Sequence, residues 1–452
     1  MSTPPLTNDR KTRRATPSQP TTPPAPTPTP ASAAGDAWGR RVISYVSSAA
    51  TRRAPGLARA LEPLAARRAL LARLAPLLVV ACVMLALAAI HYREQGFYIR
   101  PGVAGFAEVN TVDAKRLGIS NLAVNSPVGY DGQFYFFMAY KPSVIWTCPH
   151  DHAHCPTYDP DFRWQRILYP MVARALALGQ TALIPYAMLL INFISILAVV
   201  YLVGQMAVEM GASRWMGAAV GLFCGELLGF LRDLADPFGV LWIVVAIYLL
   251  RRNRPLWAAV AAAAALLTRE AFVLYLPLLA LPLLAQRRWL TLAQVAAIAL
   301  VPFLAWQAVL RALYGVWPLI SSDTRMASLV SIPLPFLGLW HTRHDYDFGV
   351  TLLAAGIPLA FAIFISLAAI WQHGPRDLLR DPVPLMALVY SVLFSLASAW
   401  NWADVWAAGR YAAPGVVLAA LVACALPWRS LRASYGVVLA LTAFAPLIEF
   451  VR

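Results

Sequence analysis

The sequence predicts an all-α protein: a polytopic transmembrane helical bundle of about eleven spans, with a large first extracytoplasmic loop that carries interfacial helices. Two observations lead to this prediction. The 452-residue chain is 60% hydrophobic and only 13% charged, whereas soluble globular proteins carry about 25% charged residues. The apolar residues form continuous runs. Only helices and closed barrels satisfy every backbone hydrogen-bonding group in lipid, and continuous apolar runs favour the helix.

The distribution of positive charge agrees with a membrane protein. The formal net charge is +15, which suggests a nucleic-acid partner, but the arginines gather between the apolar runs, as the positive-inside bias predicts. We therefore expect membrane lipids as partners and no nucleic acid. Five cysteines are too few to indicate a disulfide scaffold.

Two segments precede the predicted transmembrane domain at 74–452. Residues 1–35 are rich in Pro, Thr, Ser and Ala, so we expect a disordered cytoplasmic tail. Residues 36–73 contain eight arginines and few acids. They indicate a basic amphipathic segment that lies on the cytoplasmic membrane surface beside anionic lipids. A regulatory or partner-binding role is the alternative for this segment.

The apolar runs give the spans. About 20 apolar residues cross the hydrocarbon core, and the first run ends at Tyr92, where the chain emerges on the far side. Residues 92–181 then form the large extracytoplasmic loop. The predicted spans are 75–91, 182–206, 214–231, 237–250, 256–268, 271–285, 290–311, 349–372, 383–399, 411–427 and 433–450.

Arginines between the spans test this topology. With a cytoplasmic N-terminus, the basic connections near Arg251, Arg288, Arg380 and Arg429 all fall on the cytoplasmic side. The segment 255–286 is basic at both ends, so we expect a hairpin that turns on the outer side at its midpoint. One long tilted helix is the alternative. The protein is thus predicted to be multi-pass in the plasma or inner membrane.

The remaining charges collect at the outer ends of the spans. A charge at membrane depth costs about 2.5–3.5 kcal/mol on insertion scales, so each needs a reason. Their position indicates an active site that opens to the extracytoplasmic side, although ordinary loop charges are the alternative for any one of them. The set comprises Asp131, Arg166, Arg232, Asp233, Asp236, Arg269, Glu270, Asp404 and Arg410.

Two aromatic segments of the loop are predicted to be interfacial helices. In Gly129–Ala139, Asp131 stands where a helix would begin and aromatic residues follow. Asp is a preferred N-cap residue, so a capping role competes with a catalytic one. In the second segment, Leu168, Val172 and Ala175 recur at helical spacing.

Between these helices, Cys148 and Cys155 enclose three histidines. A disulfide between the two cysteines is expected in an oxidising compartment. A metal site is one alternative, although the spacing matches no standard zinc pattern, and unpaired thiols are the other. A divalent metal is therefore the one cofactor that the sequence leaves open.

At Gly129–Ala139 the sequence resembles the GT-C membrane glycosyltransferases. The closest likeness is to bacterial relatives of the polyprenyl-phosphate mannosyltransferases and of the PIG-V type GPI mannosyltransferases. These proteins carry an aromatic-Asp-Gly motif that leads into an aromatic helix, and later a helix rich in Tyr-Pro. The counterparts here are Tyr130-Asp131-Gly132 and Gln165–Pro170, and Leu267–Glu270 resembles their short basic-acidic element between mid-chain spans. This sequence differs in having a single acid at the motif and an inserted Cys/His segment.

The resemblance implies a hexosyltransferase or mannosyltransferase. Its donor would be a polyprenyl-phosphate-linked sugar, its acceptor a glycan, lipid or protein, and its mechanism an inverting displacement with Asp131 as the base. The leaving lipid phosphate needs permanent cations, which arginine supplies in bidentate form. The expected substrate-binding residues are Tyr130, Gln133, Arg166, Tyr169, Asp236, Arg269, Glu270 and Arg410.

Two other functions remain open. A transporter or flippase of a lipid-linked saccharide would use a comparable bundle, but such proteins often show internal repeats and midplane binding sites. The sequence has no clear repeat, and its polar residues gather at one face. A non-catalytic envelope-assembly protein is the other alternative. In such a protein, Asp131 would tolerate replacement by asparagine.

Overall fold

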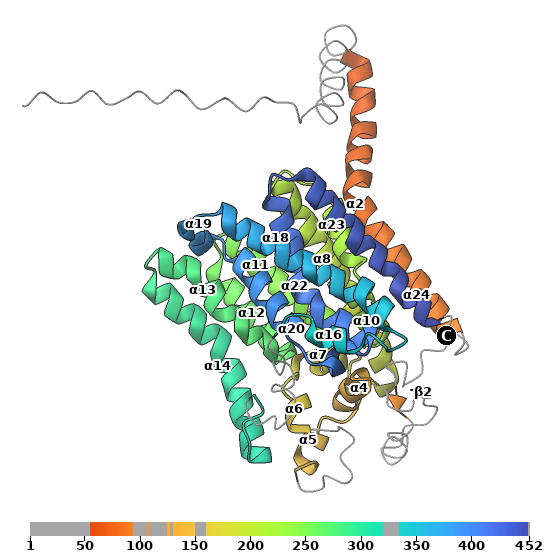
Figure 1. Cartoon of the computed structure of the whole chain (residues 1–452), viewed down its shortest axis with the longest axis vertical. Coiled ribbons are helices and arrows are strands. Elements are labelled where there is room, and N and C mark those ends of the chain that lie inside the picture. Colours follow the sequence, from red (N-terminus) through yellow and green to blue (C-terminus); the bar gives the residue numbers. More distant parts are fainter. Residues whose placement is uncertain are drawn as a thin grey trace, which may run out of the picture. The chain divides into compact units, whose positions relative to one another are not determined.

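The computed structural model describes residues 55–93, 106–107, 124–126, 130–149, 160–319 and 334–450 (Figure 1). The chain divides into two compact units, 1–70 and 71–452. In the first unit, the described part is the beginning of helix α2 (Pro55–Arg93). The predicted tail at 1–35 and residues 36–54 of the basic segment lie outside the described residues.

Where it is described, the second unit has helices and one short parallel pair of strands, β1 (Phe106–Ala107) and β2 (Val124–Ser126). This agrees with the predicted all-α class. Its longer helices, which carry most of the core, are α8 (Ile184–Glu209), α11 (Asp236–Arg251), α12 (Pro255–Thr268), α13 (Leu276–Ala285), α14 (Trp289–Tyr314), α18 (Ile357–Gln372), α20 (Val383–Ser395), α22 (Val405–Ala425) and α23 (Arg429–Leu441).

Short elements connect these helices. They are α5 (Val144–Thr147), α6 (Pro160–Arg163), η3 (Thr181–Leu183), α9 (Trp215–Gly221), α10 (Cys224–Leu231), η4 (Glu270–Tyr275), α16 (Leu337–His341), α17 (Phe348–Thr351), η5 (Leu352–Gly356), α19 (Pro375–Arg380), α21 (Ala399–Trp402), η6 (Thr442–Phe444) and α24 (Ala445–Phe450).

Among the described residues, six helical segments are long and apolar enough to cross a membrane, which is compatible with a multi-pass membrane protein. Three further apolar helices are shorter, at Pro255–Thr268, Glu270–Ala285 and Val383–Ser395. The predicted count of about eleven spans is not confirmed. The six long segments are Leu70–His91, Thr181–Glu209, Trp289–Tyr314, Phe348–Gln372, Val405–Ala425 and Arg429–Ile448.

One predicted span is interrupted. The run 214–231 forms α9 and α10, because Phe223 between them has extended backbone angles, φ −61° and ψ 131°. Hydropathy does not register such a break, since the residues on both sides are apolar. The two pieces lie in the core, where Gly217, Gly221 and Gly225 allow close approach of neighbouring helices.

The segment 255–286 reverses direction, as expected for a hairpin. Helix α12 ends at Thr268 and Arg269 is extended, with φ −154° and ψ 118°. The turn η4 follows and α13 begins at Leu276. Pro255 and Gln286, at the two ends of the segment, line the same cavity. Arg269 and Glu270 therefore lie at the opposite end of this hairpin from its basic flanks.

The two predicted loop helices exist, but the first is not exposed at an interface. Helix α4 (Gly132–Tyr140) is buried from Gly132 to Ala139, and it packs against α7 (Leu168–Leu176) and α8. A helix that is apolar on all sides is buried by protein rather than laid on a surface. Figure 1 shows α4, α5, α6 and α7 grouped at one end of the helical bundle.

Helix α22 is the most enclosed long helix and begins earlier than predicted. It starts at Val405, where the Asp404 carboxylate accepts a hydrogen bond from the Trp406 backbone N–H at 2.9 Å. The sequence placed the span after Arg410, because a charge usually ends an apolar run. Here Arg410 lies inside the helix, where a carboxylate from the loop compensates its charge.

Gly225→Ala is expected to lower the free energy of unfolding by about 1–3 kcal/mol, the usual cost of overpacking. Helices α10 and α22 cross at this glycine, and a Cβ atom there would overlap the carbonyl oxygen of Gly409. Thermal unfolding of the purified protein measures the effect. Gly349→Ala is the matched control, since a Cβ there meets no atom within 4 Å. Equal unfolding temperatures would contradict the close crossing.

Candidate functional site

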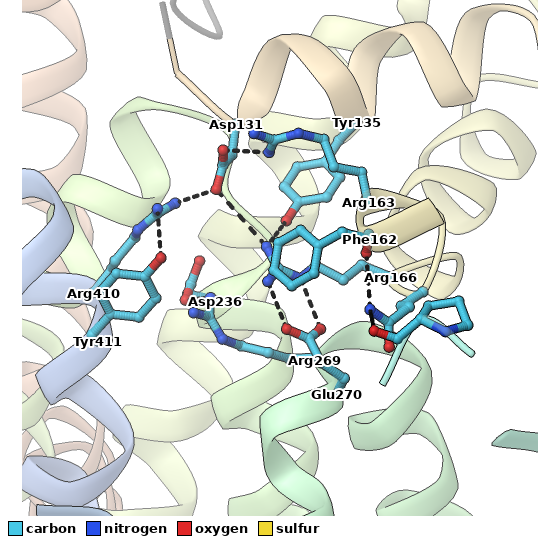
Figure 2. A network of polar contacts seen from close by, with 12 residues as sticks. Asp131, Tyr135, Phe162, Arg163, Arg166, Asp236, Arg269, Glu270, Arg410 and Tyr411 are labelled. Carbon is cyan, nitrogen blue, oxygen red and sulfur yellow. Dashed lines mark hydrogen bonds and ion pairs between the residues drawn. The ribbon is translucent and has the colours of Figure 1, made fainter. Parts of the chain in front are cut away.

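Three arginines surround the carboxylate of Asp131 (Figure 2). Arg163 donates to Oδ1 at 2.5 Å, and Arg410 donates to Oδ2 at 2.8 Å. Arg166 lies 3.8 Å from the same Oδ2. All three arginine side chains are at most 8% exposed. The loop helix α6 and the turn that follows it thus meet the core helix α22 at one carboxylate.

Asp131 occupies the N-cap position of α4, yet its side chain makes no capping hydrogen bond. The capping role that the sequence left open is therefore not what holds this carboxylate. Burial alone would raise the pKa of Asp131, but the charges of Arg163, Arg410 and Arg166 and the hydrogen bond from Arg163 outweigh it. They hold the pKa well below its usual range, so the carboxylate is an anion locked between cations.

Arg166 links Asp131 to the mid-chain turn. Its Nε and Nη2 donate to the two oxygens of Glu270 at 2.9 and 2.7 Å, a bidentate pair. Its Nη1 donates to the Tyr135 hydroxyl at 3.0 Å. The guanidinium also stacks over the Phe162 ring at 4.7 Å. Each of the three nitrogens of this guanidinium therefore donates to a protein group, which orients the side chain.

A second buried ion pair lies beside the first. Arg269 pairs with Asp236, the first residue of α11, and its guanidinium stacks over the Tyr411 ring at 4.8 Å. The Tyr411 hydroxyl accepts a hydrogen bond from Arg410 at 3.1 Å. Figure 2 shows how this ring lies between the two arginines. Tyr411 thus contacts both Arg269 and Arg410, and so links the Arg269–Asp236 pair to the arginines around Asp131.

Tyr130 fixes the loop motif to the start of α22. Its hydroxyl donates to Oδ2 of Asp404, whose other oxygen caps that helix. Burial and the Asp404 charge raise the pKa of Tyr130 well above its usual range. The phenol therefore remains a donor. The Arg232 guanidinium lies over the Trp406 ring at 4.5 Å, next to this contact.

The structure brings together most of the predicted site residues. Asp131, Arg166, Glu270 and Arg410 are in direct contact, and the Asp236–Arg269 pair adjoins them. Tyr130 joins through Asp404 and lies 5.8 Å from the Arg410 guanidinium. Two predicted residues occupy different surroundings. Gln133 is buried within α4, and Tyr169 is fully buried between α7 and α8.

Asp233 stays outside this network. It has a left-handed backbone, with φ +50°, between α10 and α11, and it is 1% exposed. Burial raises its pKa well above the usual range, without a compensating cation. We therefore expect Asp233 to be protonated, unlike Asp131.

Tyr169→Phe is expected to leave activity within about twofold and to cost about 1 kcal/mol of stability, the typical value of one hydrogen bond. The Tyr169 hydroxyl donates to the Met188 carbonyl at 3.3 Å and accepts from Asn192 at 3.0 Å. Its ring meets the Tyr135 ring edge-on. Activity and thermal unfolding of the variant check this packing role, and a large loss of activity at normal stability would favour substrate contact.

Three participants were not among the predicted site residues. Arg163 lies three residues before Arg166, a spacing that brings side chains of a helical turn together. Tyr135 lies four residues after Asp131, on the same face of α4. Tyr411 follows Arg410 directly. Helical spacing could have indicated the first two, whereas only the folded structure shows that Tyr411 separates two arginines.

The Cys/His segment is largely outside the described residues. Cys148 is disulfide-bonded, and the predicted partner Cys155 lies outside the described part of the chain, as do the three histidines. Where side chains are described, no group of three or more His, Cys, Asp or Glu residues could hold a metal ion. The structure therefore offers no test of the metal that the sequence left open.

Comparisons with protein-family models, with curated proteins and with solved structures gave no match to this chain. A buried group of rigid arginines around one carboxylate can bind an anion, orient it and compensate charge that develops on it.

Proposed function

We propose that the chain is an integral membrane glycosyltransferase of the GT-C type, resembling hexosyltransferases and mannosyltransferases. It would transfer a sugar from a polyprenyl-phosphate donor to a glycan, lipid or protein acceptor outside the cytoplasm. The observation that supports this most is the arginine group around Asp131. The buried network contains four arginines and three carboxylates, so it carries one excess positive charge. The arginines are Arg163, Arg166, Arg269 and Arg410, and the carboxylates are Asp131, Asp236 and Glu270.

A donor phosphate fits this charge pattern. The Asp131 carboxylate presents two oxygens to Arg163 and Arg410, which is the arrangement that a phosphate offers to arginine. The Nε atoms of Arg269 and Arg410 are buried and have no hydrogen-bond partner in the described structure. An unpaired buried donor costs about 1–3 kcal/mol. A phosphate in contact with these atoms would remove that cost, which favours binding of an anion.

Asp131 then becomes available as the base. While three arginines hold it, its low pKa makes it a poor proton acceptor. When the donor phosphate binds these arginines in place of Asp131, the carboxylate loses its ion pairs and its pKa rises toward the ordinary value. A bond forms between the acceptor oxygen and the sugar C1, and the bond from C1 to the phosphate oxygen breaks. The acceptor proton passes to Asp131, and the lipid phosphate leaves with its charge compensated by the arginines. One displacement of this kind inverts the anomeric centre.

The proposed orientation places this site outside the cytoplasm and the N-terminus inside. Arg251, Arg288 and Arg380 gather at the other end of the bundle, as cytoplasmic connections would. The disulfide bond of Cys148 supports an oxidising compartment for the loop. The eleven-span arrangement in the plasma or inner membrane is part of this proposal.

The test is deletion of the gene in its native host, followed by mass spectrometry of lipid-linked sugars and envelope glycans. We expect a missing sugar on the glycan and accumulation of its polyprenyl-phosphate donor. Wild type should restore the sugar, whereas Asp131→Asn at equal membrane level should not. If the donor accumulates only on the cytoplasmic leaflet, a flippase explains the phenotype instead. If Asp131→Asn restores the sugar, a non-catalytic assembly protein is favoured.

A further inference from the structure

Two neighbouring cavities lie at the end of the bundle away from Asp131. One, of about 190 Å³, is lined by apolar residues and by six polar or charged ones, among them Arg251, Arg288 and Arg380. The other, of about 290 Å³, lies between α12, α13 and α14. Both are bordered by Leu250, Pro255, Leu279 and Leu283. The two cavities therefore adjoin across these four residues; we call the first the basic mouth and the second the apolar arm.

The apolar arm exists because small residues face it. Alanines from α12 and α14, Ala258, Ala262 and Ala296 among them, leave room between the helices. Each residue that lines this arm is apolar. Such a cavity stays dry and accepts hydrocarbon rather than water. Its outer wall, α14, exposes Leu290, Val301 and other apolar side chains, so the surroundings of the arm are also apolar.

The mouth carries an excess of positive charge. Its three arginines face a single carboxylate, Asp381, which pairs with Arg251 at 2.6 Å. Arg288 and Arg380 have no acidic partner within the described part of the chain. Arg288 also precedes the first turn of α14, where unpaired backbone N–H groups favour an anion. The mouth is therefore built for a negatively charged group.

This space is separate from the Asp131 network. Helix α11 runs from Asp236, in the network, to Arg251, at the mouth. Fifteen residues of helix span about 22 Å. The mouth and the network thus lie at opposite ends of α11. No residue that lines the cavities takes part in the contacts around Asp131.

We propose that the two cavities form one binding site for an anionic phospholipid of the surrounding bilayer. A hydrocarbon chain occupies the apolar arm, and the phosphate headgroup contacts Arg288 and Arg380. This site requires no catalytic activity and stands independently of the proposed transferase function. The arginines favour an anionic headgroup, and the apolar lining of the arm favours a hydrocarbon chain.

The test uses the full-length protein, purified in neutral detergent and stripped of lipid, with native mass spectrometry as the readout. It is titrated with phosphatidylglycerol and with phosphatidylcholine. We expect one phosphatidylglycerol to bind at least about tenfold more tightly than phosphatidylcholine. The double variant Arg288→Ala/Arg380→Ala should lose about 30-fold, because each arginine near an anionic lipid contributes roughly fivefold. Ala296→Phe, which fills the apolar arm, should lose binding as well.

Matched controls separate the site from general surface effects. Arg376→Ala removes an exposed charge of α19 outside the cavity, and Ala297→Phe adds the same ring on the exposed side of α14. Both should bind phosphatidylglycerol within twofold of wild type. Equal loss in the controls would overturn the proposal. Three other results would also overturn it. A prenyl phosphate could bind more tightly than phosphatidylglycerol, or inorganic phosphate alone could displace phosphatidylglycerol. The protein could also form a dimer that Ala296→Phe dissociates.

Discussion

Asp131→Asn is expected to lower sugar transfer by about 10²–10⁴-fold, the usual contribution of one positioned base. The asparagine keeps the shape of the side chain and its position at the start of α4, but its amide cannot accept the acceptor proton. Transfer is measured with purified protein and a polyprenyl-phosphate sugar, and the inverted product is quantified by mass spectrometry. The acceptor is supplied as total envelope lipid and glycan extract from the deletion strain.

Donor binding distinguishes this loss from misfolding. In the wild type, Asp131 competes with the donor phosphate for Arg163 and Arg410. Asp131→Asn removes the competing charge, so the variant should bind the donor as tightly as wild type or more tightly while failing to transfer. A misfolded variant would lose both. Loss of donor binding together with a lowered unfolding temperature would show that Asp131 is structural.

Asp161→Asn supplies the matched control. Asp161 belongs to the same loop and is partly exposed, two residues before Arg163, and it takes no part in the contacts around Asp131. We expect transfer and donor binding within twofold of wild type. If Asp161→Asn is as inactive as Asp131→Asn, the loop tolerates no amide substitution and the role assigned to Asp131 is wrong.

The sequence predicted most of the charged site because charges stand out in an apolar chain. Arg269, Glu270 and Arg410 each interrupt an apolar run at a cost that needs compensation, and the structure shows the compensation as buried ion pairs. Arg163 was missed because it lies in a polar stretch, where a further arginine resembles an ordinary loop charge. Aromatic residues such as Tyr411 carry no such signal, since they are also common core residues.

The spans were harder to predict than the fold class. Hydropathy reports where apolar residues are, but it does not report backbone breaks such as the one at Phe223. Hydropathy also ends a predicted span at a charged residue, as it did at Arg410. It does so even where a residue distant in the sequence neutralises that charge. Such pairings, 279 residues apart for Asp131 and Arg410, depend on tertiary structure and have no local signature.

Glu270→Ala is expected to lower the free energy of unfolding by about 3–5 kcal/mol. The buried Arg166 guanidinium would lose its bidentate partner and keep only Asp131, which lies 3.8 Å away and also pairs with two other arginines. The side chains of Arg166 and Glu270 are only 4% and 6% exposed, and two hydrogen bonds join them. Thermal and denaturant unfolding of the purified protein measure the loss. We expect transfer to fall too, since Arg166 loses the partner that orients it toward Asp131.

The chain contains a surface pair for comparison. Arg252 and Glu209 form an ion pair whose side chains are 49% and 47% exposed. Exposed pairs contribute about 0–1 kcal/mol, so Glu209→Ala should change the unfolding temperature little. If Glu209→Ala and Glu270→Ala destabilise the protein equally, the Arg166–Glu270 pair is not buried as the structure places it.

Replacing both partners separates stability from function. In the double variant Arg166→Met/Glu270→Leu no unpaired charge remains, and apolar replacement of a buried ion pair is often neutral or stabilising. We therefore expect the double variant to recover most of the stability that Glu270→Ala loses, while donor binding and transfer stay low because one phosphate-facing guanidinium is gone. A double variant that regains both stability and transfer would show that Arg166 and Glu270 serve the fold alone. Recovery of stability without transfer would assign the pair to the site, since misfolding could not then explain the loss of transfer.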